Sequence, residues 1–174
     1  MNLDTLREEY DLSRRYTRSL YEDLSEADIQ WRPAPKSSAI GWHLGHQAAV
    51  NHYMTRNLLN AEASLDPQLD ALFDSATPEE NRGDLPSLAA ILGYRDTIAQ
   101  RTHARLDAIA TAEHSAARQL RLLIAPIMVG IINHEYQHDC WIREMRARLG
   151  HDKADQVFSK RVVQLNGYWV LQPG

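Results

Sequence analysis

Two histidines four residues apart, His134 and His138, are the residues of this sequence best placed to do chemistry. In a helix they stand one turn apart on the same face. That face is otherwise apolar, so both imidazoles are expected to point into the protein interior. The residues on this face are Ile127, Ile131, His134, His138, Trp141, Met145 and Leu149. An unpaired buried imidazole costs about 1–3 kcal/mol. A divalent metal ion shared by both rings would offset that cost; two separately hydrogen-bonded core histidines are the alternative.

A third imidazole on another helix would complete a metal site. The segment from residue 37 or 38 to about residue 60 is helical in pattern and carries His43, His46 and His52. At about 100° per residue, His46 shares a face with apolar neighbours, His43 lies about 60° away, and His52 is nearly opposite. His46 is therefore the predicted third ligand and His43 the reserve. His52 is expected at the surface.

Other side chains could support or compete with these histidines. Four polar residues lie within reach of them by sequence and could orient the rings, although Glu135 and Gln137 are expected to face solvent. The four are Gln47, Tyr53, Glu135 and Gln137. The single cysteine, Cys140, falls about 200° round the helix from His138 and is predicted to face away from the site. No catalytic residue is identifiable.

Composition narrows the class of protein. The chain has 174 residues, 44% hydrophobic and 24% charged, which is ordinary for one soluble domain spanning 1–174. The net charge of −4 and the dispersed basic residues argue against a nucleic-acid partner. One cysteine precludes an internal disulfide, and no apolar run is long enough to span a membrane. We expect a cytoplasmic protein with no membrane partner.

Helical periodicity predicts an all-α four-helix bundle over about residues 4–150. The polar stretch 61–85, with a short helical turn of its own, is expected to act as a long crossover between the second and third helices and to wall part of the site. The prolines Pro33 and Pro35 predict an extended connection between the first two helices. The expected helices cover 4–24, 37–60, 84–112 and, from a start between 118 and 126, the residues up to Gly150.

The C-terminal segment, about residues 160–172, carries a β-hairpin signal. Two β-prone runs flank Asn166-Gly167, the preferred pair for a type I′ turn. An isolated hairpin is marginal in water, so this one is expected to dock on the bundle or on a second subunit. A homodimer is a further prediction.

Three segments, taken in order, resemble the DinB/YfiT-like superfamily of metal-dependent enzymes. They are Leu24–Pro33, Ile40–His46 and His134–His138, followed by Leu149-Gly150. The resemblance implies a four-helix bundle with a crossover between helices two and three. It also implies one divalent ion, zinc, nickel or iron, held by three histidines at the positions of His46, His134 and His138.

Relatives in that superfamily include thiol S-transferases and isomerases that use low-molecular-weight thiols. The resemblance therefore implies a metal-dependent enzyme acting on a small molecule, as a thiol S-transferase or a hydrolase with a metal-activated thiol or water. Three neutral imidazoles would leave coordination positions open, as catalytic sites do. The alternative is a non-catalytic metal-binding or stress-related bundle protein.

Overall fold

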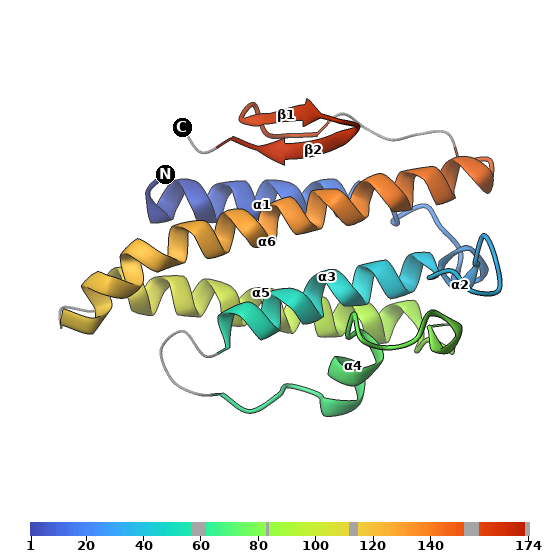
Figure 1. The fold of residues 1–174 in the computed structure, drawn as a ribbon, viewed down its shortest axis with the longest axis horizontal. Helices are drawn as coiled ribbons and strands as arrows, with labels where there is room; N and C mark the ends of the chain where they lie inside the picture. Colours follow the sequence, from blue (N-terminus) through green and yellow to red (C-terminus); the bar gives the residue numbers. More distant parts are fainter. Residues whose placement is uncertain (57–61, 83, 112–114, 152–156, 173–174) are drawn as a thin grey trace.

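The computed structural model describes the chain except for residues 57–61, 83, 112–114, 152–156 and 173–174. Over the described residues, four long helices pack together and a two-stranded antiparallel hairpin follows them (Figure 1). The elements are α1 Leu3–Ser19, α2 Glu26–Gln30, α3 Ile40–Thr55, α4 Pro67–Leu72, the 3₁₀ helix η1 Glu79–Asn81, α5 Leu88–Thr111, α6 Ser115–Arg148, β1 Val162–Leu165 and β2 Tyr168–Leu171. The predicted helical fold with a C-terminal hairpin is confirmed.

The long helices run in two directions. In Figure 1, α1 and α6 run one way and α3 and α5 run the other. Because α3 and α5 are parallel, the chain must travel back along the bundle between them, and the segment holding α4 and η1 makes that return. The predicted crossover is thus present. It places Phe73, at the end of α4, fully inside the core.

The ends of the first helices differ from the predicted ones. α1 ends at Ser19, five residues before the predicted end, although Leu20 and Leu24 remain buried in the following turns. α2 was not predicted: Ser25 and Asp28 form a capping box inside the connection that the prolines suggested was extended. The α3 N-cap is Ala39 rather than Ser37 or Ser38.

The ends of the other helices also differ from the predictions. α6 begins at Ser115 and accommodates Pro126 inside the helix, whereas the sequence predicted a start between 118 and 126. It ends as predicted, because Gly150 adopts a φ of +84°, which favours glycine. The predicted ends of the second helix, near Asn60, and of the third, near Ala112, lie outside the described residues.

The hairpin has the predicted two-residue turn. Leu165 pairs with Tyr168, and the residues between them, Asn166 and Gly167, both have positive φ, at 51° and 87°. This is the type I′ geometry. The hairpin docks on the chain's own bundle: Leu171 is buried, and its N–H donates to Oδ1 of Asn133 on α6 at 2.7 Å. A second subunit is therefore not needed to support it, and the homodimer stays a prediction.

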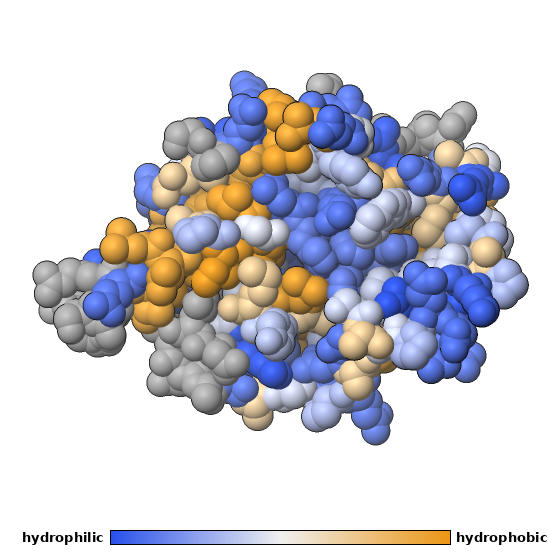
Figure 2. All heavy atoms as spheres, in the orientation of Figure 1, coloured by the Kyte–Doolittle hydropathy of each residue, from blue (hydrophilic) through white to orange (hydrophobic). Residues whose placement is uncertain are grey.

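The outer surface is uneven in polarity. Figure 2 shows a hydrophobic area toward the end of the molecule where α6 begins, and Leu122 and Leu123 of that helix are exposed. Within the part of the chain that the structure describes, no helix combines the length and the apolar character needed to cross a lipid bilayer.

Candidate metal centre

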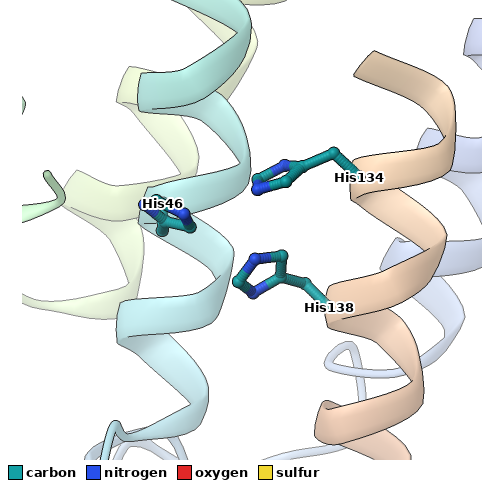
Figure 3. Close-up of side chains that lie close together, drawn as sticks. All are labelled: His46, His134 and His138. Atoms are coloured by element: carbon teal, nitrogen blue, oxygen red, sulfur yellow. The ribbon is translucent and has the colours of Figure 1, made fainter. Parts of the chain in front are cut away.

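Three histidines from two adjacent helices converge inside the bundle. His46 comes from α3, and His134 and His138 come from successive turns of α6 (Figure 3). Each offers one ring nitrogen, and these nitrogens all lie within 4.8 Å of one another. His46 and His138 are buried and His134 is partly buried. The structure thus brings together the three histidines singled out in the sequence.

The position of His46 depends on a close approach of the crossover to α3. Gly45 lies against the ring of Phe73, where a Cβ atom would stand 2.3 Å from the ring carbons. Because glycine leaves that space free, the carbonyl oxygen of Phe73 accepts a hydrogen bond from Nδ1 of His46 at 2.6 Å. A carbonyl can only accept, so the proton sits on Nδ1 and the lone pair of Nε2 is available to a metal.

His138 is oriented in a similar way by His43. The two Nδ1 atoms are 2.8 Å apart, so one ring donates to the other. When His138 is the donor, its Nε2 carries the lone pair that a metal needs. His43 lies against the cluster but does not join it. Its reserve role as a ligand stays a prediction.

Aromatic rings enclose the cluster. Trp42 stacks on His46 with a centroid separation of 4.5 Å and an interplanar angle of 12°. Trp141 meets His138 edge to face at 4.7 Å. These indoles restrict the rotamers of His46 and His138.

The surroundings keep the imidazoles neutral. Burial lowers the pKa of His43 to about 3 and that of His134 to about 4, with a smaller contribution from the nearby His46 in each case. Burial also lowers the pKa of His46 and, far more strongly, that of His138. A metal ligand must offer a lone pair rather than a proton, so neutral imidazoles suit a metal. The donor set therefore fits a divalent transition metal ion.

A buried polar network lies immediately behind the histidines. Gln47, Glu135 and Asp139 each directly follow a cluster histidine in the sequence. Nε2 of Gln47 donates to Oδ1 of Asp139 and to the carbonyl oxygen of Glu135, both at 2.9 Å. Arg95 on α5 donates to Oε1 of Gln47 at 2.7 Å and forms an ion pair with Glu135 at 3.2 Å. The network links α3, α5 and α6 where they present the histidines.

The network corrects one prediction. Glu135 was expected to face solvent, but its side chain is only 3% exposed. Residue 135 lies about 100° round α6 from His134, toward the interior shared with α1 and α5. Arg95 is a charged residue on an otherwise apolar helical face. Because a buried arginine needs an acidic partner, it could have indicated a buried acid such as Glu135. Gln137 is exposed as predicted, and Tyr53 is 71% exposed, so it does not orient the cluster.

His52 was predicted at the surface, and that prediction is wrong. It is 2% exposed, and its Nε2 accepts the backbone N–H of Leu65 at 3.1 Å. The crossover covers the face of α3 that points away from α6, so this face is also interior. Cys140 does face away from the cluster, as predicted: its Sγ lies 3.8 Å from the carbonyl oxygen of Gly167 in the hairpin.

Two cavities adjoin the cluster at His46, and the crossover walls both, as the sequence predicted. One, of about 560 Å³, reaches His43, His46 and His138 and is also lined by Trp42, Trp141 and Arg82. The other, of about 520 Å³, lies on the opposite side of His46. Asp70, Ala71 and residues 73–75 line the second cavity, and Ser75 borders both. Small molecules could therefore reach the histidines.

Comparison with protein families matches residues 9–142 to the DinB superfamily. The matched region runs from α1 into α6 and contains all three cluster histidines. Comparison with curated proteins found no match to this chain. Because the family match covers well over half of the sequence, the chain belongs to the DinB superfamily.

Proposed function

We propose that this protein is a divalent-metal-dependent enzyme acting on a small molecule, with His46, His134 and His138 as the ligands of one zinc, nickel or iron ion. The observation that carries the proposal is the convergence of three neutral imidazole nitrogens within 4.8 Å of one another beside a cavity. Membership of the DinB superfamily supports it.

The donor set favours a catalytic over a purely structural site. Structural zinc sites are typically closed by four protein ligands, whereas catalytic ones keep a position for water or substrate. Among the described residues, the cluster contains three histidines and no cysteine or carboxylate. An ion bound there would lower the pKa of a thiol or water placed beside it, so that a nucleophile is available near neutral pH.

The protein's own residues would prepare the site. The carbonyl of Phe73 holds His46 in the tautomer that leaves the Nε2 lone pair free, and His43 would do the same for His138 by accepting from its Nδ1. Trp42 and Trp141 provide an apolar wall next to the reacting groups. The larger cavity can hold a molecule the size of a small thiol. We therefore propose thiol S-transfer as the reaction, and hydrolysis as the second candidate from the same site.

The test begins with elemental analysis of untagged protein, comparing wild type with His46→Ala. About one metal per chain in the wild type, lost in the variant, supports the site. The loaded protein is then assayed for conjugation of low-molecular-weight thiols with electrophiles and for hydrolysis of esters and amides. Bound metal without either activity would favour a non-catalytic metal-binding protein, and a wild type that takes up no metal after reconstitution would refute the proposal.

A further inference from the structure

The larger cavity beside the cluster contains an arginine, Arg82, that forms no ion pair with any residue that the structure describes. Arg82, in the crossover after η1, places its guanidinium carbon 3.9 Å from the ring centroid of Trp42. Trp42 in turn stacks on His46. A cation thus lies one indole ring away from a cluster histidine and lines the same cavity.

Neutral groups hold this guanidinium in place. Its Nε donates to the carbonyl oxygen of Thr77 at 2.8 Å, Nη2 to that of Ser75 at 2.7 Å, and Nη1 to the hydroxyl of Ser38 at 3.2 Å. A guanidinium has five N–H donors, so some remain for another acceptor. Among the described residues, no carboxylate pairs with Arg82, in contrast to Arg95 with Glu135.

The charged residues that line the cavity differ in how exposed they are. Lys36, Arg148, Glu79 and Glu144 also line it, but all four are exposed and their charges balance. The inner wall holds neutral histidines, indoles and the partly buried Arg82. The exposed Glu79 acts on Arg82 only at longer range than an ion pair, so this partly desolvated cation still favours binding of an anion. A divalent ion held by three neutral imidazoles would leave its own charge uncompensated and add to this preference.

We infer that the small molecule taken by this cavity carries an anionic group, such as a carboxylate, that binds Arg82 while its reacting end lies at the histidines. This inference rests on the proposed function for the role of the histidines. Arg82 then determines specificity: its loss removes the protein's own contribution to the preference for anionic ligands and leaves the affinity for neutral ones.

The experiment compares two thiols of nearly equal size, 3-mercaptopropionate and its neutral amide 3-mercaptopropanamide. Binding to the Co²⁺-loaded protein is followed by the visible absorption of the cobalt, and binding to the metal-free protein by the fluorescence of the indoles in the cavity wall. We expect the wild type to bind the anion at least about tenfold more tightly than the amide, as loss of a charged hydrogen-bonding partner is worth about 1.5–3 kcal/mol.

Three variants make the result specific. In the metal-free protein, Arg82→Gln should bind the two thiols with equal affinity while retaining the wild-type affinity for the amide. In the cobalt-loaded protein the same substitution should reduce the anion preference to the part that the metal supplies. Arg82→Lys should keep part of the preference. Arg101→Gln, which removes an exposed arginine of α5 outside the cavity, should behave as wild type. Circular dichroism confirms that each variant is folded.

An anion preference that persists undiminished in metal-free Arg82→Gln, or its absence from the wild type, would overturn the inference. The two titrations separate this from the proposed function. If cobalt does not bind but the metal-free protein shows an Arg82-dependent preference, the metal proposal fails and the anion inference stands. If cobalt binds and no preference is seen, the anion inference alone fails.

Discussion

The buried network behind the histidines predicts a strong energetic coupling between Glu135 and Asp139. Glu135 forms an ion pair with Arg95, whose side chain is 4% exposed, and Gln47 bridges Arg95 to Asp139. Burial, and next the charge of Glu135, raises the pKa of Asp139 well above its usual value. Both causes favour the protonated form of Asp139.

Each single substitution should be tolerated because the network can adjust. In Glu135→Gln the negative neighbour is gone, the pKa of Asp139 falls, and Asp139 can ionise to balance Arg95. We expect a cost of about 1.5–3 kcal/mol, the value of a hydrogen bond to a charged group. Asp139→Asn replaces a neutral acid by a neutral amide of similar shape, so it should cost about 1 kcal/mol.

The double variant has no anion left to balance Arg95. Breaking a buried ion pair and leaving one charge uncompensated costs about 3–5 kcal/mol, to which the lost hydrogen bonds of Asp139 are added. The double variant should thus be destabilised by about 1–2 kcal/mol more than the sum of the two singles, a coupling within the range seen for residues of one network.

Urea unfolding of metal-free protein at pH 7, followed by circular dichroism, measures this cycle. The four proteins are compared by their midpoints with a common dependence on urea. Thr111→Ser on α5, an exposed position distant in sequence from the network, serves as the control. Additivity of the two substitutions within about 0.5 kcal/mol would refute the reasoning. A double variant that cannot fold while both singles do would support it.

Three further predictions follow from the site. His134→Ala should abolish stoichiometric metal binding. His43→Ala should retain it but weaken metal affinity about 10- to 100-fold, because we propose that His43 orients a ligand rather than binding the metal. A competition titration with a chelator measures both effects, and unchanged metal content in His134→Ala would contradict the ligand assignment. The metal-free protein should gain stability from about pH 4.5 to about pH 6.5. Folding lowers the pKa values of the buried histidines, so in this range they bind protons in the unfolded chain but not in the folded one. Asp139, whose pKa is raised on folding, has the opposite effect, but it is one group against several histidines. Urea midpoints across this range test the sign, and a midpoint that falls with rising pH would contradict it. Gly45→Ala should lower the free energy of unfolding by about 1–3 kcal/mol or more, because the new methyl group overlaps the ring of Phe73. It should also weaken metal binding by displacing the carbonyl that orients His46. Gly93→Ala on α5, where a Cβ would meet no atom within 4 Å, is the matched control, and equal stability of the two variants would contradict the packing argument.

Local regularities in the sequence were sufficient for much of this structure. The four-residue spacing of His134 and His138 places them on one face of any α-helix, whatever surrounds it. The turn at Asn166-Gly167 follows from two residues that tolerate positive φ. The capping box at Ser25 was also local, and it was missed because the nearby prolines carried more weight in the prediction. These features depend on the backbone of a few consecutive residues.

The burial of polar residues was decided by tertiary packing. Helical periodicity shows which residues share a face, but it does not show how many faces are covered. α3 is enclosed by α5, α6 and the crossover, so His52 is interior although it lies opposite His46. In the same way, Glu135 is interior because Arg95, forty residues away in the sequence, faces it across the bundle.

The different contacts of His43 and His46 show most clearly what helical periodicity does not predict. The two residues differ by three positions, and by about 60° on the helix, so the sequence alone ranked them without separating their functions. The structure separates them through contacts from distant segments: the carbonyl of Phe73 directs His46 into the cluster, and His138 engages the Nδ1 of His43. The sequence by itself determined the helices and the face that carries the histidines. Only the packing of the crossover against α3 decided which nitrogen atoms meet, because those contacts join residues that have no local relation.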